Sequence, residues 1–172
     1  MKYLFFVLML SFVCFSGQVS AQKSAAKTQE KLVWYTDLMK ANEQSKATKK
    51  PIFAFFTGSD WCGWCHKMQN EVFAKPEFIK WARKNVILLE LDFPRQKQLP
   101  PALAQQNNSL QQAFKVSGFP TVWMFFMEKD KVTNKMDISP LGSLGYPGDA
   151  IPGKEEVKFL SNANKILANG KS

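Results

Sequence analysis

The feature that most constrains the fold is a continuous apolar segment followed at once by small, turn-forming residues. Residues 52–56 read Ile-Phe-Ala-Phe-Phe and are followed by Thr57-Gly58-Ser59. A short apolar run without polar alternation, bounded by turn-forming residues, is typical of a central strand that is buried on both faces. The segment therefore predicts the central strand of a packed sheet.

Apolar periodicity predicts further strands and helices on both sides of this strand. Strands are expected at 32–35, 86–92 and 121–126, with an edge strand at 144–146, and helices at 37–49, 62–72 and 77–84. We also expect a C-terminal helix that covers the sheet with a face made of Val157, Leu160, Ala163 and Leu167. This alternation of strands and helices predicts a single α/β domain.

Finer patterns predict details within these elements. In the helix at 37–49, Leu38, Met39 and Ala41 are available for the buried face. Residues 94–108 are rich in Pro, Gln and Asn and are expected to form a loop or irregular insertion. After it, Ser109 and Gln112 fit a capping box, which predicts a short helix ending at Val116.

The first 30 residues differ in character from the rest of the chain. After Met1-Lys2, residues 3–15 are apolar except for Ser11, and small residues follow up to Ala21. The apolar run of about 13 residues is shorter than the roughly 20 needed to cross a bilayer, so a retained anchor is the weaker reading and a signal peptide the stronger. We expect cleavage after Ala21 (signal 1–21), a flexible linker at 22–30 and a domain at 31–172, with export to the periplasm or beyond and no stable membrane insertion.

Removal of the signal peptide would remove Cys14 and leave only Cys62 and Cys65. A disulfide between residues so close in sequence removes little chain entropy, so chemistry explains the pair better than stability does. Cys62 lies where a strand should turn into a helix, beside unsatisfied N–H groups and the positive end of the helix dipole, which favours its thiolate. Cys62 is therefore the predicted nucleophile, and Cys65 the resolving thiol that releases the mixed disulfide.

Two motifs around these residues resemble those of the thioredoxin superfamily. Trp61-Cys62-Gly63-Trp64-Cys65 follows one apolar strand, and Gly118-Phe119-Pro120-Thr121 precedes another. The resemblance covers roughly residues 31 to 168, and Gly-Ser-Asp-Trp-Cys-x-Trp-Cys at 58–65 is most similar to exported bacterial members described as thioredoxin-like or disulfide-isomerase-like.

The resemblance implies an α/β/α sandwich of three layers with a central mixed sheet. It also implies that Pro120 is cis and that Phe119, Pro120 and Thr121 face the dithiol and an extended client. In addition it implies supporting roles for Trp61, Gly63 and Trp64, and no metal or organic cofactor.

Three positions affect the expected chemistry. Phe56 stands where thioredoxin has a buried acid, so Cys65 would need another base or water. Trp64 replaces a proline, and the residues between the cysteines tune thiol pKa and reduction potential, so the direction of exchange is left open, with reductase or isomerase favoured over oxidase. The single histidine, His66, is four residues after Cys62 and either approaches the first helical turn or faces solvent.

Other functions compete with an oxidoreductase. Cys62-x-x-Cys65-His66 also fits c-type haem attachment, with one of seven methionines as a second ligand, although the preceding apolar strand and the α/β pattern disfavour it. A structural zinc site needs about four ligands, whereas two cysteines and one histidine remain. A redox-inactive peptide-binding or chaperone-like module would use Trp61, Trp64 and Phe119 as an apolar patch.

The net charge of the chain indicates which kinds of partner to expect. The chain has 23 basic and 14 acidic residues and a net charge of +9, carried mainly by isolated lysines. Without an arginine-rich run or nucleic-acid motif, this pattern predicts a solvated lysine surface and no nucleic-acid role. The expected partners are protein thiols and disulfides of the cell envelope and a membrane or soluble redox donor or acceptor, and the protein is expected to be a monomer.

Overall fold

The computed structural model describes residues 31–130 and 136–170. The predicted signal peptide at 1–21, Cys14 within it, and the predicted linker at 22–30 lie outside the described residues. Within the two described ranges, no helix is both long and apolar enough to cross a membrane.

The centre of the domain is a mixed sheet with strand order β1-β3-β2-β4-β5. Its strands are β1 (Trp34–Tyr35), β2 (Ile52–Thr57), β3 (Ile87–Asp92), β4 (Thr121–Lys129) and β5 (Met136–Gly145). β1, β3 and β2 are parallel, whereas β4 is antiparallel to β2 and β5 is antiparallel to β4. β2 lies in the middle and all of its residues are buried, which confirms the predicted central strand.

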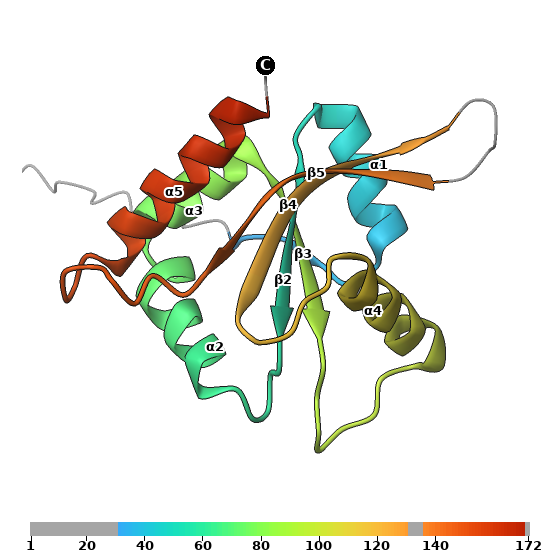
Figure 1. The fold of residues 1–172 in the computed structure, drawn as a ribbon, viewed down its shortest axis with the longest axis horizontal. Helices are drawn as coiled ribbons and strands as arrows, with labels where there is room; N and C mark the ends of the chain where they lie inside the picture. Colours follow the sequence, from blue (N-terminus) through green and yellow to red (C-terminus); the bar gives the residue numbers. More distant parts are fainter. Residues whose placement is uncertain (1–30, 131–135, 171–172) are drawn as a thin grey trace, which may run out of the picture. The chain divides into compact units, whose positions relative to one another are not determined.

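Helices cover both faces of this sheet. They are α1 (Leu38–Thr48), α2 (Gly63–Met68), the π-helical segment η1 (Gln69–Phe73), α3 (Pro76–Asn85), α4 (Pro101–Ala113) and α5 (Glu155–Asn169). The cores place α2, η1, α3 and α5 on one face and α1 and α4 on the other, as Figure 1 shows. The predicted α/β/α sandwich with a mixed sheet is therefore confirmed.

Successive residues of β2 point to opposite faces and enter different cores. Phe53 and Phe55 belong to the core beneath α2, α3 and α5, which also contains both cysteines, whereas Phe56 belongs to the core beneath α1 and α4. Around Phe53, the rings of Phe73, Phe78, Trp81 and Phe159 have centroids 5.8–6.2 Å away. The layer that carries the dithiol is thus fixed by packed aromatic rings.

The prediction of an irregular segment holds for residues 94–100 but is wrong for residues 101–108, and the predicted capping box at Ser109 is also wrong. α4 begins at Pro101, where a proline in the first turn needs no hydrogen-bonded N–H, and Ser109 lies inside the helix rather than at its N-cap. Asn107 and Leu110 are the buried residues of α4, and the Asn107 side chain donates to the Asp92 carbonyl oxygen at 2.9 Å. Because a polar residue takes a buried position in the helix, the apolar periodicity was too weak to reveal it.

The buried face of the C-terminal helix also differs from the prediction. Val157 is 57% exposed, whereas Phe159 is 1% exposed and contributes to the core with Ala163. Leu160 and Leu167 are partly buried and pack against the same core. At the start of α5, the prediction therefore placed Val157 on the buried face, whereas the structure places Phe159 there.

The remaining boundaries follow the predictions with local changes. α1 is capped by the Asp37 carboxylate, which accepts from Lys40 N at 3.0 Å, but Met39 on this helix is exposed rather than buried. The strand expected at 121–126 continues to Lys129. The edge strand expected at 144–146 is the much longer β5, which ends at Gly145.

Candidate active site

The two cysteines lie where the central strand turns into a helix. After β2, the carbonyl oxygen of Gly58 accepts hydrogen bonds from the backbone N–H groups of Trp61 and Cys62 at 3.2 and 2.9 Å. Cys62 is the N-cap of α2, and its sulfur accepts from Cys65 N at 3.2 Å. Both side chains are buried, and they are joined by a disulfide with an S–S distance of 2.07 Å.

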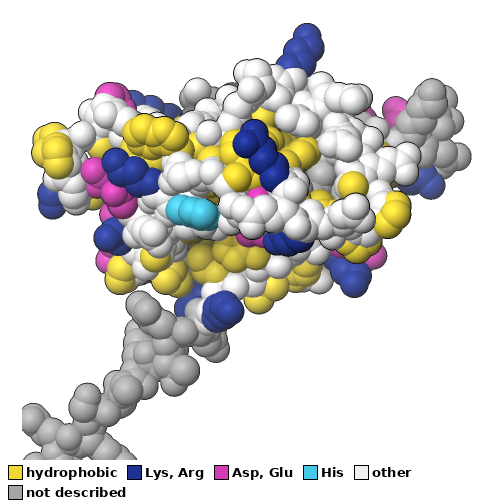
Figure 2. Space-filling model, turned by 90° about the horizontal axis from the view of Figure 1, so that it is seen from below, with side chains coloured by type: hydrophobic (Ala, Val, Ile, Leu, Met, Phe, Trp, Pro, Cys, Tyr) yellow, Lys and Arg dark blue, Asp and Glu magenta, His cyan; other side chains and the backbone are white. Residues whose placement is uncertain are grey.

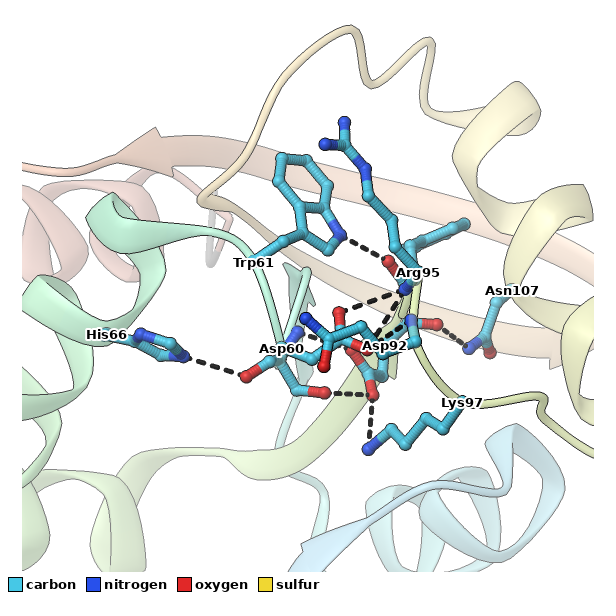
Figure 3. A network of polar contacts seen from close by, with 10 residues as sticks. Asp60, Trp61, His66, Asp92, Arg95, Lys97 and Asn107 are labelled. Carbon is cyan, nitrogen blue, oxygen red and sulfur yellow. Dashed lines mark hydrogen bonds and ion pairs between the residues drawn. The ribbon is translucent and has the colours of Figure 1, made fainter.

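The loop before Cys62 is held by a carboxylate from the end of β3. Asp92 accepts hydrogen bonds from Ser59 N at 2.8 Å and from Ser59 Oγ at 2.6 Å, and it lies 3.1 Å from Lys97 Nζ (Figure 3). Its carbonyl oxygen is the acceptor for Asn107 of α4. The hydrogen bond to Asp92 raises the pKa of Lys97. Asp92 is buried, so this network connects the interior of the sheet to the loop that leads to Cys62.

A second carboxylate joins the same loop to the segment after β3. Asp60 accepts hydrogen bonds from the backbone N–H groups of Arg95 and Gln96, and these bonds lower the pKa of Asp60. Trp61 Nε1 donates to the Phe93 carbonyl oxygen at 2.8 Å, and the Arg95 guanidinium lies 3.8 Å from the Trp61 ring centroid (Figure 3). The indole that precedes Cys62 is therefore fixed by segment 93–96.

His66 lies on the first turns of α2 and faces the preceding loop. Its Nε2 is 2.8 Å from the carbonyl oxygen of Ser59, and the side chain is exposed. Because a carbonyl oxygen only accepts, this contact places a proton on Nε2. His66 thus braces the loop that leads to Cys62, while an effect on the thiolate itself stays a prediction.

Trp64, between the cysteines, belongs to a second aromatic cluster. Its ring centroid is 5.1 Å from that of Tyr146, and Lys67 Nζ lies 5.1 Å from each of the two rings. The Tyr146 hydroxyl donates a hydrogen bond to Glu71 of η1. Burial, assisted by Glu71, raises the pKa of Tyr146 above its ordinary value.

The motif Gly118-Phe119-Pro120-Thr121, at the start of β4, also lies beside Trp61. The Phe119–Pro120 peptide bond is cis, as predicted. The Phe119 ring lies 5.9 Å from Trp61 and 5.0 Å from Phe93, and Thr121 Oγ1 donates to the Gly118 carbonyl oxygen at 2.7 Å. Trp61 and Phe119, which are far apart in sequence, are thereby brought together beside the dithiol.

Carboxylates near the site were not found from the sequence. Phe56, in place of the buried acid, faces away from the dithiol and packs near Phe93 and Phe114. In contrast, Glu90 pairs with Phe55 across β2 and β3 and shares the face of the sheet that carries the cysteines. Burial, and then the charge of Asp92, raises the pKa of Glu90. The one available signal was two acids near the end of an otherwise apolar strand.

Metal ligation is not suggested by the described part of the chain. Among residues 31–130 and 136–170, no group of three or more His, Cys, Asp or Glu side chains is arranged to hold a metal ion.

A dithiol at the start of a helix after the central strand, beside a cis-proline loop on a mixed α/β sheet, defines the thioredoxin fold. The family model of the thioredoxin-like domain matches residues 38–134, which is more than half of the chain. The protein belongs to this thioredoxin-like family.

Two curated relatives come from Chlamydia pneumoniae. The chain is 40% identical over 106 residues to the disulfide bond reductase DsbH, and 30% identical over 103 residues to the thioredoxin-related protein DsbJ. These matches span 62% and 60% of this chain, but only 63% of DsbH and 30% of DsbJ.

Solved structures agree with the fold assignment. A structure of DsbH oxidoreductase is 31% identical, with a TM-score of 0.65 over 80% of this chain and 85% of that one. A thioredoxin from Thermus thermophilus is only 15% identical, yet it has a TM-score of 0.55 over 81% of this chain and 89% of that one. The second comparison supports the fold alone.

Proposed function

We propose that this protein is an exported thiol:disulfide oxidoreductase that exchanges disulfides with protein clients. The observation that carries the proposal is the Cys62–Cys65 disulfide, which lies at the N-terminus of α2 in a thioredoxin-like domain. The similarity to a protein named disulfide bond reductase supports the same chemistry.

The reaction proceeds in two exchanges. In the reduced protein, the Cys62 thiolate attacks one sulfur of a client disulfide, which forms a mixed disulfide and releases the other client sulfur as a thiolate that takes up a proton. Cys65 then loses its proton, and its thiolate attacks the Cys62 sulfur, closes the Cys62–Cys65 bond and releases the second client sulfur as a thiolate that takes up a proton. The client gains two electrons, and an external dithiol donor must return them to the protein.

The surrounding residues have supporting roles in this proposal. The helix N-terminus stabilises the Cys62 thiolate through its N–H groups, including the Cys65 N–H that already points to the Cys62 sulfur. Phe119, Pro120 and Thr121 present the backbone to an extended client, and Trp61, Gly63, Trp64 and His66 shape the rim. No metal or organic cofactor is required for thiol exchange.

Reductase or isomerase activity is favoured over oxidation of clients, because the relative DsbH is named a reductase. The expected setting is the periplasm or the extracellular space, reached with a signal peptide at 1–21 that is cleaved after Ala21. The expected clients are envelope proteins with thiols or disulfides, and a membrane or soluble partner supplies the electrons to a monomeric domain at 31–172.

A peptide-binding module without redox function is the second candidate, since Trp61 and Trp64 are exposed beside the cysteines. Such a module would keep its affinity for unfolded clients when both cysteines become serine. Attachment of haem to Cys62, Cys65 and His66 is a weaker alternative, because the cysteines follow a buried strand of a thioredoxin-like domain.

The deciding experiment equilibrates the mature protein with glutathione buffers and measures the fraction of free thiols, with Cys62→Ser as the control. A reduction potential of about −270 mV indicates a thioredoxin-like reductant, and one of about −120 mV indicates an oxidant. A protein whose thiols do not titrate is not an oxidoreductase, and the peptide-binding module then becomes the better explanation.

A further inference from the structure

We infer that the surface around Cys62 selects extended client segments that carry an acidic side chain next to the reacting cysteine. This inference rests on the proposed function and specifies the client class. The surface consists of two clusters: Trp61 with Arg95, and Trp64 with Lys67 and Tyr146.

Two exposed indoles frame the buried dithiol. Trp61 is 37% exposed and directly precedes Cys62, and Trp64 is 58% exposed and directly precedes Cys65. Large exposed aromatic side chains are typical of binding surfaces, because they offer apolar area with little loss of conformational entropy. A client that delivers a sulfur to Cys62 is therefore expected to pack on one of these rings.

Each indole carries a cation on its face. The Arg95 guanidinium lies 3.8 Å from the centroid of the Trp61 ring, and Lys67 Nζ lies 5.1 Å from the centroids of Trp64 and Tyr146. Both cationic side chains are exposed. Cation–aromatic contacts hold the charges at the two edges of the dithiol.

The nearby carboxylates are turned toward the protein. Asp60 is half-buried and accepts backbone hydrogen bonds, Asp92 is buried and pairs with Ser59 and Lys97, and half-buried Glu71 accepts from Tyr146. Half-buried Glu155 accepts from Gly153 N at 3.1 Å, and backbone hydrogen bonds and then the charge of Lys67 lower its pKa. The exposed charges of the two clusters, on Arg95 and Lys67, are positive. Figure 2 looks onto this end of the domain and shows hydrophobic and basic side chains around the histidine, with some acidic side chains among them.

This arrangement matches a specific kind of segment. An acidic side chain one or two residues from the client cysteine can pair with Arg95 or Lys67 while its neighbours pack on the indoles. An exposed ion pair of this kind changes a rate constant by roughly two- to threefold, so two pairs together change it by about four- to tenfold. The net charge of +9 also steers anionic segments toward the protein at low salt.

The test uses three synthetic peptides of equal length, each linked through its cysteine to a fluorescent thiol, with the flanking positions Asp/Glu, Asn/Gln or Lys. The second-order rate constant for release of the fluorophore by reduced protein is measured at low and high salt. Hydroxyethyl disulfide, which is small and uncharged, serves as the reference substrate for each variant.

We expect the acidic peptide to react about three- to tenfold faster than the neutral one at low salt, and the basic peptide to react more slowly. The double variant Lys67→Glu/Arg95→Glu reverses this order. The matched control Lys40→Glu/Lys46→Glu makes the same charge change on α1, across the sheet, and keeps the order of the original protein.

Three results overturn the inference. If all three peptides react at the same rate while hydroxyethyl disulfide is reduced, the client class is wrong and the proposed function stands. If the control on α1 reverses the order as well as the double variant does, net charge alone explains the preference. A protein that reduces neither the peptides nor hydroxyethyl disulfide refutes the proposed function together with the inference.

Discussion

Replacement of Asp92 by alanine should destabilise the oxidised protein more than any nearby surface change. The carboxylate is buried and accepts two hydrogen bonds from Ser59, at 2.8 and 2.6 Å. Hydrogen bonds to a charged group contribute roughly 1.5–3 kcal/mol each. Burial and then the charge of Asp92 raise the pKa of Glu90, and Asp92→Ala removes this repulsion, which offsets part of the lost stability. The free energy of unfolding is therefore expected to fall by about 3 kcal/mol.

The matched control is Lys97→Ala. The ion pair between Lys97 and Asp92 has an exposed ammonium, and such pairs are worth about 0–1 kcal/mol. Asp92→Asn should fall between the two, because the amide oxygen can still accept from Ser59 N whereas the amide nitrogen cannot accept from Ser59 Oγ.

Urea unfolding of the oxidised proteins, monitored by tryptophan fluorescence, measures these differences. The variants should shift the midpoint at an unchanged slope, since the surface exposed on unfolding is the same. A loss below about 1 kcal/mol for Asp92→Ala would refute the argument that this carboxylate anchors the loop. An equal loss for Lys97→Ala would assign the stabilisation to the ion pair.

Three further predictions follow from individual side chains. Burial raises the pKa of Glu90 above its value in the unfolded chain, so ionisation of Glu90 lowers the stability of the fold as pH rises. Glu90→Gln should therefore raise the melting temperature at pH 8, and this gain should disappear near pH 4. A lower melting temperature of Glu90→Gln at pH 8 would mean that a partner stabilises the carboxylate. A Cβ on Gly58 would lie 2.4 Å from Trp61 Cε2, whereas a Cβ on Gly63 would meet nothing within 4 Å. Gly58→Ala should therefore lower the free energy of unfolding by roughly 1–3 kcal/mol and shift the tryptophan emission. Equal effects of Gly63→Ala would contradict this explanation. Phe159→Ala should cost about 3–5 kcal/mol and Val157→Ala less than about 0.5 kcal/mol in urea unfolding, and the reverse order would restore the apolar face expected from the sequence.

The predictions that succeeded rest on local signals. The apolar run at 52–56 identifies β2 because a strand covered on both faces has no polar alternation. The position of Cys62 after this strand predicts the start of α2, and the helix expected from residue 37 is α1, for which Asp37 is the N-cap. In each case the neighbours in sequence are also the neighbours that determine the structure.

The predictions that failed depended on distant partners. Asn107 occupies a buried position in α4 because the Asp92 carbonyl oxygen, 15 residues away, satisfies its amide, so residues 101–108 form a helix that their composition conceals. Val157 and Phe159 are both apolar residues near the start of α5, and only the position of the helix on the sheet decides that Phe159 is the buried one.

The features of the active site likewise fall into those that follow from local sequence and those that depend on distant partners. The sequence by itself determined the cysteine pair, its place at a helix N-terminus and the proline motif that accompanies it. Only the tertiary structure placed Asp92 on Ser59, Arg95 on Trp61, and Tyr146 on both Trp64 and Glu71. These partners are at least 33 residues apart in sequence, so their contacts follow from strand register and from helix packing on the sheet rather than from any local pattern.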